Sequence, residues 1–186
     1  VPLKFESWDA FFIVFGEKTT ATDYKNPLKT ETTLSQISTP WKVSFNDKNI
    51  TFDKLTSWSE STDRDIKYFS GTATYDNSFS ISSLDKSAKY IIDLGDVKNI
   101  AEVIVNGKNM GTAWKKPFKL DVSEAVKDGN NTIQVNVTNT WVNRLIGDAQ
   151  PNTKTKTTFT TMPFYRPDSP LLPSGLIGDM KIIMIK

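Results

Sequence analysis

The chain has 186 residues, of which 38% are hydrophobic and 24% are charged, and this balance is typical of a globular protein with one core. It contains neither histidine nor cysteine, which excludes a Ser-His-Asp or Cys-His nucleophile, a disulfide and a zinc site built on those ligands. The 23 basic and 21 acidic residues are scattered, and no apolar run approaches the ~20 residues of a membrane span, so we expect neither nucleic acid nor a membrane as a partner.

The N-terminal part of the sequence differs from the rest. Residues 10–15 form a continuous apolar run, Ala-Phe-Phe-Ile-Val-Phe, which predicts a strand buried on both faces. Residues 17–35 are rich in Thr, Lys, Asn and Pro and predict a connector. We place a domain boundary near residue 36, with residues 1–35 as a strand and connector left from a preceding domain. The first residues show neither an initiator methionine nor a signal-peptide pattern, so we expect a segment of a longer protein.

From residue 36 to residue 186, short strand patterns follow one another. Alternating or dense apolar patterns occur at residues 41–45, 75–81, 89–94, 100–105, 118–122, 133–137 and 180–185. Asn106-Gly107 is the dipeptide best suited to a type I′ turn and predicts a tight hairpin. Only residues 123–127 hint at a helix, and they span barely one turn. The sequence therefore predicts an all-β fold, a sandwich of two packed sheets.

A series of motifs in this second part resembles a known family. The motifs include Tyr-Phe-Ser-Gly-Thr-Ala-Thr-Tyr at 68–75, Ala-Glu-Val-Ile-Val-Asn-Gly-Lys at 101–108 and Trp-Val-Asn-Arg-Leu-Ile-Gly-Asp at 141–148. Together with Pro117-Phe118 and residues 129–139 and 169–176, they are similar to the sugar-binding domain of glycoside hydrolase family 2, in the form found near the C-terminus of bacterial α-L-rhamnosidase-like enzymes. The resemblance covers residues 38–186. It implies a galactose-binding-domain-like jelly roll with an extra N-terminal strand.

The resemblance also implies partners and a location. In such enzymes the acid and base carboxylates belong to a separate barrel domain, so no catalytic residue carries over to this chain. The implied partners are a carbohydrate, bound weakly, and the catalytic domain of the parent chain. The implied location is the periplasm or the cell exterior.

Sugar recognition needs an aromatic face for the pyranose ring and planar polar groups for its hydroxyls. Asn139, Trp141, Asn143 and Arg144 follow a predicted strand end, so we expect them on a rim loop as ligand-binding residues. Asp148 then accepts a hydrogen bond from a sugar hydroxyl or holds Arg144. The alternative is that Trp141 lies in the core and that Arg144 and Asp148 pair to fix the loop.

Two further segments offer candidate ligand-binding residues. Trp114 follows the predicted hairpin beside Lys115 and Lys116, and it either binds a sugar or packs across the sheet. Tyr165 and Arg166 lie in a long irregular region, residues 149–174. They either face a ligand or pack on the catalytic domain.

Other roles have less support in the sequence. Trp58 lies in a polar loop, and we expect it to cover the core at the rim rather than to act as a lid or an interdomain contact. Asp63 and Asp65 carry oxygen ligands that suit calcium, but the spacing of an EF-hand is absent, so we expect no cofactor. No spacing of acidic residues indicates the carboxylate pair of a glycosidase.

Three hypotheses for function follow. The leading one is a non-catalytic carbohydrate-binding or ancillary domain of a larger glycoside hydrolase. The alternative is a structural module that buttresses the catalytic domain through residues 164–172, and it requires an exposed apolar patch there. The third, an independent enzyme, requires a deep pocket with two facing carboxylates.

Overall fold

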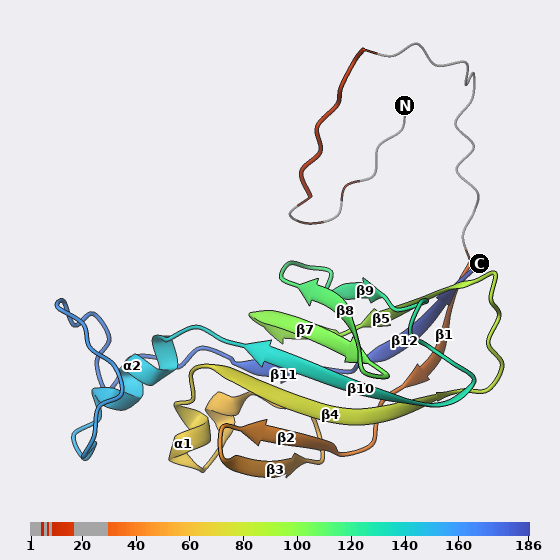
Figure 1. The fold of residues 1–186 in the computed structure, drawn as a ribbon. Coiled ribbons are helices and arrows are strands. Elements are labelled where there is room, and N and C mark those ends of the chain that lie inside the picture. Colours follow the sequence, from red (N-terminus) through yellow and green to blue (C-terminus); the bar gives the residue numbers. More distant parts are fainter. Residues whose placement is uncertain (1–4, 6, 8, 17–29) are drawn as a thin grey trace.

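The computed structural model describes residues 5, 7, 9–16 and 30–186, and it confirms the predicted all-β sandwich (Figure 1). One antiparallel sheet has four strands, in the spatial order β1 (Glu31–Gln36), β12 (Lys181–Ile185), β5 (Lys89–Asp93) and β9 (Lys119–Asp121). A second has six, in the order β3 (Lys48–Phe52), β2 (Trp41–Phe45), β4 (Thr72–Ile81), β10 (Gly129–Thr138), β7 (Ile100–Val105) and β8 (Lys108–Ala113).

The remaining elements are short. β11 (Gly175–Ile177) pairs with β6 (Asp96–Lys98) in a separate two-stranded ladder. The helical segments are η1 (Trp58–Glu60), α1 (Arg64–Lys67) and α2 (Val142–Asp148). None of the helices among the described residues has the length and apolar character needed to cross a membrane.

The inner faces of the sheets share one hydrophobic core, and β10 shows how the sequence builds it. Ile133, Val135 and Val137 are buried, as their alternation predicts, and each contributes about 1.5–3 kcal/mol through burial. Asn136, between them, points to the opposite face. There its Nδ2 donates to Glu102 Oε2 at 2.9 Å, and its Oδ1 accepts from Thr74 Oγ1 at 2.9 Å. Because the two faces differ so strongly, a slip of one residue would bury polar groups, and the strand register is fixed.

The predicted hairpin at Asn106-Gly107 is present between β7 and β8. Both residues have positive φ, 50° and 80°, as a type I′ turn requires. The Asn106 side chain also ties the turn to its neighbours, because its Nδ2 donates to Ala125 O at 2.8 Å and its Oδ1 accepts from Thr132 N at 3.0 Å. The turn is therefore anchored on both sides.

An aromatic cluster closes one end of the core. Trp58 is fully buried against Phe45, Phe69 and Tyr75, so it is a core residue and not the rim cover that the polar loop around it suggested. Its Nε1 donates to Tyr75 Oη, which also accepts from Leu176 N at 3.2 Å. Burial raises the pKa of Tyr75 to about 12, although these two hydrogen bonds oppose the rise. The apolar partners of Trp58 come from distant strands, so its neighbours in sequence do not reveal them.

The N-terminal segment differs from the expectation. Residues 10–16 form no strand and their large apolar side chains are exposed, because no strand of the described chain pairs with them. Most of the predicted connector, residues 17–29, lies outside the described residues. β1 begins at Glu31 and pairs with β12, so residues 31–35 belong to the four-stranded sheet although the predicted boundary lies near residue 36.

The sandwich begins and ends at one place. Thr30 N donates to Lys186 O at 3.0 Å, and Lys186 N donates to Thr30 O at 3.1 Å. In Figure 1 this point lies at the right, and α2 lies at the opposite end.

Candidate functional site

Several strand ends gather at the end of the sandwich that carries α2. Thr138, the last residue of β10, pairs with Ile100 at the start of β7, and Ala101 pairs with Ala113 at the end of β8. The segments after Thr138 and Ala113 therefore leave the six-stranded sheet at the same end. Since neighbouring strands lie about 4.8 Å apart, these two exits are about 10 Å from each other.

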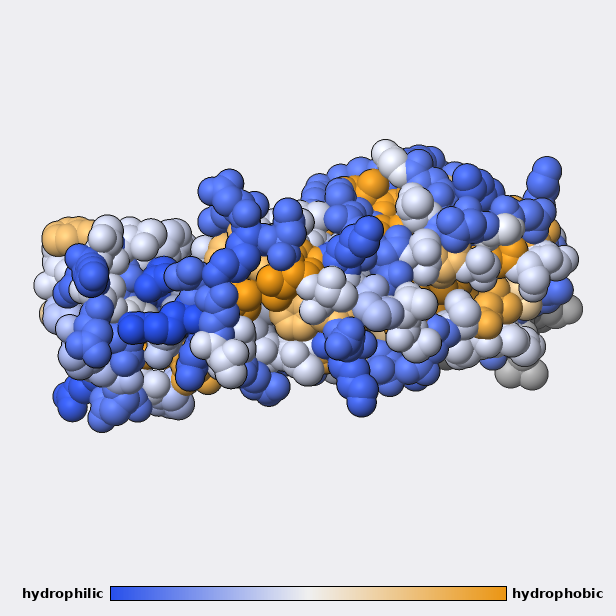
Figure 2. Space-filling model, turned by 90° about the horizontal axis from the view of Figure 1, so that it is seen from below, coloured by the Kyte–Doolittle hydropathy of each residue, from blue (hydrophilic) through white to orange (hydrophobic). Residues whose placement is uncertain are grey.

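Exposed apolar side chains concentrate at this end. From residue 30 onward, the large hydrophobic side chains that the structure exposes are Leu34, Ile100, Trp114, Trp141, Phe159, Met162, Phe164 and Leu172. All except Leu34 belong to the strand ends and loops at this end of the sandwich. Seen from below, the molecule carries its hydrophobic residues in separate patches among hydrophilic ones (Figure 2). Large exposed apolar groups gathered in one region indicate a binding surface.

Two of the predicted ligand-binding residues hold the chain together. Asn139 Nδ2 donates to Phe69 O at 2.9 Å, and its Oδ1 accepts from Gly71 N at 3.0 Å. Asn143 is buried, with Nδ2 donating to Leu172 O at 2.7 Å and Oδ1 accepting from Leu172 N at 2.8 Å. Both amides are therefore occupied in fastening the strand ends and the returning chain.

Arg144 and Asp148 form an ion pair within α2, with Nη2 and Oδ1 separated by 2.8 Å. The other carboxylate oxygen of Asp148 accepts from Thr157 N, Thr158 N and Thr158 Oγ1 at 2.7–2.8 Å. Burial alone would raise the pKa of Asp148, but the bonds from Thr158, the charge of Arg144 and the bond from Thr157 outweigh it and lower the pKa. We call Arg144, Asp148, Thr157 and Thr158 the loop clamp, because they fix the loop after α2 to the helix.

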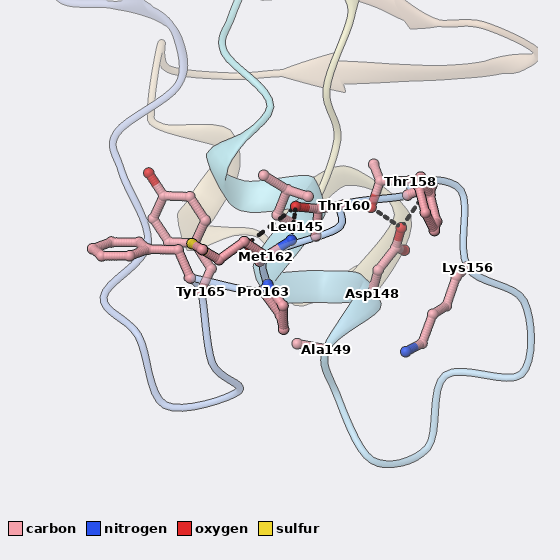
Figure 3. A pocket seen from close by; sticks show the side chains of 11 residues that line it. Leu145, Asp148, Ala149, Lys156, Thr158, Thr160, Met162, Pro163 and Tyr165 are labelled. Carbon is pink, nitrogen blue, oxygen red and sulfur yellow. Dashed lines mark hydrogen bonds between the residues drawn. The ribbon is translucent and has the colours of Figure 1, made fainter.

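The clamped loop presents apolar side chains to solvent. Phe159, Met162 and Phe164 are 80–89% exposed, and we call these three residues the tip surface. They line a pocket of about 350 Å³ with Tyr165, whose ring meets that of Phe164 edge-on at 5.2 Å. In Figure 3, Tyr165 and Met162 lie on one side of this pocket and Asp148 on the other.

The other aromatic candidate lies in a separate pocket. Trp114 is 67% exposed and does not pack across the sheet. We call its pocket, of about 360 Å³, the Trp114 pocket; it is lined by Val97, Lys98, Asn99, Trp114, Lys115, Lys116 and Phe118. Asn99 N donates to Thr138 O at 3.0 Å, which places this pocket beside the end of β10. In the described chain, no group hydrogen-bonds the side-chain amide of Asn99, so that amide is open to a ligand.

The predicted site is thus divided. Trp114 and Tyr165 line different pockets, and Trp141, 57% exposed before α2, lines neither of them. Arg166 is exposed, and only its backbone is held within the described chain: its N donates to Ser169 Oγ at 2.9 Å and its O accepts from Ser169 N at 3.1 Å. The sequence interpretation also missed Asn99, Phe159 and Met162. Nothing in a loop sequence says which side chains it exposes, and these residues had no motif to mark them.

The acidic pair considered for calcium is engaged by a lysine. Lys48 Nζ lies 2.6 Å from Asp63 Oδ2 and 3.2 Å from Asp65 Oδ2, and Asp63 also caps α1 by accepting from Asp65 N at 2.9 Å. The bond from Lys48 is the main reason that the pKa of Asp63 is lowered. The ammonium group thus pairs with one oxygen of each carboxylate and lies where a cation shared by the two would bind. Within the described residues, no cluster of three or more acidic side chains is placed to hold a metal.

Comparison with known proteins shows which family this chain resembles. Residues 55–167 match the family described as glycosyl hydrolase 2 galactose-binding domain-like. A protein of Formosa agariphila named putative beta-glucuronidase is 42% identical over 172 aligned residues, which cover 76% of this chain and 15% of that protein.

Solved structures agree with this match. The rhamnosidase from Novosphingobium sp. PP1Y superposes with a TM-score of 0.84 at 39% identity, covering 89% of this chain and 16% of that chain. A β-glucuronidase from Ruminococcus gnavus, in complex with uronic deoxynojirimycin, superposes with a TM-score of 0.62 at 17% identity over 87% of this chain and 30% of its own, and shares the fold. The chain therefore corresponds to an ancillary domain that spans about 15% of the length of its curated relative.

Proposed function

Because this chain belongs to the glycosyl hydrolase 2 galactose-binding domain-like family, we propose that it is a non-catalytic domain of a glycoside hydrolase that docks on the catalytic domain of the same enzyme through the tip surface. The observation that carries the proposal is the exposure of Phe159, Met162 and Phe164 on a loop that the clamp holds in place. The structural hypothesis required an exposed apolar patch, and these side chains supply it at and just before residues 164–172.

Energetic considerations support docking at this surface. Burying a side chain of the size of Phe or Met contributes about 1.5–3 kcal/mol, so a partner that covers the tip surface gains substantially. The clamp fixes the loop beforehand, which lowers the entropy that docking costs. The partner we propose is a domain of the same polypeptide, since the curated relative is several times longer than this chain. We also propose a location in the periplasm or the cell exterior, which the glycoside hydrolase family favours.

The two pockets at the α2 end of the sandwich favour a non-catalytic role for this end. A glycosidase needs two facing carboxylates, one of them protonated. The pocket beside the tip surface has one carboxylate among its described lining residues, that of Asp148. Its Oδ2 accepts three hydrogen bonds, and its Oδ1 faces Arg144. The lining of the Trp114 pocket includes no carboxylate.

Hydrogen exchange tests the docking proposal. We expect the backbone amides of residues 157–165 to exchange at least about tenfold more slowly in the complete enzyme than in the isolated 186-residue chain, because docking excludes water from the loop. Phe164→Ser in the complete enzyme removes this protection, whereas Leu34→Ser, at an exposed residue of β1, leaves it unchanged. Equal exchange of the loop in both forms contradicts docking.

A second function, weak carbohydrate binding, is favoured at the Trp114 pocket. There an exposed indole lies beside the open amide of Asn99, and this is the combination that a pyranose ring and its hydroxyls need. A glycan array followed by calorimetric titration tests this function. Trp114→Ala weakens binding by about tenfold if the pocket is the site, and Trp141→Ala, at the other exposed tryptophan of this end, preserves it. No binding at millimolar sugar leaves docking as the sole function.

A further inference from the structure

The charges around the Trp114 pocket are unbalanced. Lys98, Lys115 and Lys116 line it. Asp96 Oδ2 lies 2.8 Å from Lys98 Nζ, while Asp96 Oδ1 is 3.9 Å from Lys116 Nζ, so Lys98 is the closer partner. The remaining ammonium group, that of Lys115, pairs with Asp9. Among the residues that the structure describes, two carboxylates therefore face three ammonium groups, and Lys116, whose side chain is 60% exposed, is the least neutralised.

Asp93 does not correct this imbalance. Asp93 Oδ2 lies 3.6 Å from Lys119 Nζ, so that pair is neutral by itself. None of the described lining residues carries a negative charge. A ligand seated on the Trp114 indole therefore meets a positive potential at Lys116, with Lys98 and Lys115 held in place by their partners.

We infer that the Trp114 pocket selects carbohydrates that carry a negative charge, a carboxylate or a sulfate. The indole stacks on the sugar ring, the Asn99 amide hydrogen-bonds a ring hydroxyl, and Lys116 pairs with the anionic group. This inference rests on the carbohydrate-binding role proposed above and adds the class of sugar. Because Lys116 is exposed, the selectivity is modest, about twofold to fivefold.

Matched sugars test the inference on the 186-residue chain. Methyl β-D-glucuronide and methyl β-D-glucoside share one ring and differ in a carboxylate against a hydroxymethyl group, and glucose 6-sulfate supplies the sulfate arm. Titrations followed by amide chemical shifts give the affinity of each. We expect both anionic sugars to bind about twofold to fivefold more tightly than the glucoside at low salt, and the difference to disappear at about 0.5 M salt because exposed charges are screened.

Two variants and a control assign the effect to residues. Lys116→Gln lowers the affinity for the anionic sugars to that of the glucoside and leaves the glucoside unchanged. Trp114→Ala weakens all three sugars by about tenfold, since stacking is common to them. Lys42→Gln, at an exposed lysine of β2 outside the pocket, changes nothing.

The outcomes distinguish the proposed charge selectivity from the carbohydrate binding on which it rests. Equal affinity for charged and neutral sugars, with loss in Trp114→Ala, overturns the charge selectivity and leaves carbohydrate binding in place. A preference that survives Lys116→Gln also overturns the inference. No binding of any of the three sugars at millimolar concentration overturns both.

Discussion

The loop after α2 and the β8–β9 connection lie at the same end of the sandwich but use their residues in opposite ways. In α2 the polar side chains of Asn143 and Asp148 are buried and hydrogen-bonded inside the protein, and in the loop that follows the apolar side chains of the tip surface face solvent. In the β8–β9 connection Lys116 is exposed beside an exposed indole, and Asn99 opposite it keeps a free amide. The loop after α2 is therefore suited to contact with another protein domain, which excludes water, and the β8–β9 connection is suited to binding a soluble polar ligand.

The strongest test of this contrast removes the centre of the loop clamp. Asp148→Ala leaves Arg144 without its partner and three donors of Thr157 and Thr158 unpaired. We expect a loss of about 3 kcal/mol in the free energy of unfolding, measured by urea denaturation. Asp65→Ala, at a carboxylate whose side chain is 83% exposed, is the control and costs less than about 0.5 kcal/mol. A small effect at Asp148 would show that the clamp contributes little to the stability of the fold.

A somewhat smaller loss is expected at Asn143. Asn143→Ala removes both hydrogen bonds to the Leu172 backbone, so the Leu172 N–H loses its side-chain partner and the Leu172 C=O keeps only Ser174 Oγ, at 3.3 Å. The expected cost is about 2 kcal/mol, again from urea denaturation. Asn130→Ala, on the exposed end of β10, serves as the matched amide and stays within about 0.5 kcal/mol of wild type. Equal costs at the two positions would contradict a structural role for Asn143.

The pH dependence of stability tests how much the negative charge of Asp148 contributes to the free energy of unfolding. Because its folded pKa is lowered, its charge stabilises the protein fully above the pKa of an unfolded Asp, near 4, and this stabilisation is lost as the pH falls through the folded pKa. The stability gap between wild type and Asp148→Asn therefore shrinks on acidification. We expect a change smaller than that from deleting the side chain, and melting temperatures from pH 7 down to pH 3 measure it. A gap that stays constant would mean that ionisation of Asp148 contributes nothing.

The smallest effects on stability are expected at the exposed aromatic residues. Phe164→Ser and Trp114→Ala each change the unfolding free energy of the isolated chain by less than about 0.5 kcal/mol, because both side chains are mostly exposed already. Phe45→Ala, at a buried ring, costs about 3–5 kcal/mol in the same assay. If Phe164→Ser destabilised the isolated chain by more than 1 kcal/mol, the tip surface would be serving this domain's own packing.

The sequence predicts the fold better than it predicts the candidate site. The alternation at Ile133, Val135 and Val137 and the Asn106-Gly107 turn are local signals, and the structure confirms both. Trp58 shows the limit, because the rings that bury it come from residues 45, 69 and 75.

The site depends on such distant contacts throughout. Asn143 resembles a sugar ligand in sequence, yet its partner is Leu172, which lies 29 residues away. Residues 10–15 have the composition of a buried strand, but a strand forms only where a neighbour supplies its hydrogen bonds, and the described chain supplies none. Composition and periodicity therefore predict strands and core, while the function of a polar loop residue depends on which distant groups reach it.

The mutual hydrogen bonds between Thr30 and Lys186 have a mechanical consequence. Residues 30 and 186 thus lie at one corner of the sandwich, and the tip surface lies at the opposite end (Figure 1). A contact at the tip surface therefore acts with a long lever about this corner. If the catalytic domain docks there as we propose, that contact sets the orientation of the sandwich and with it the direction in which the Trp114 pocket faces.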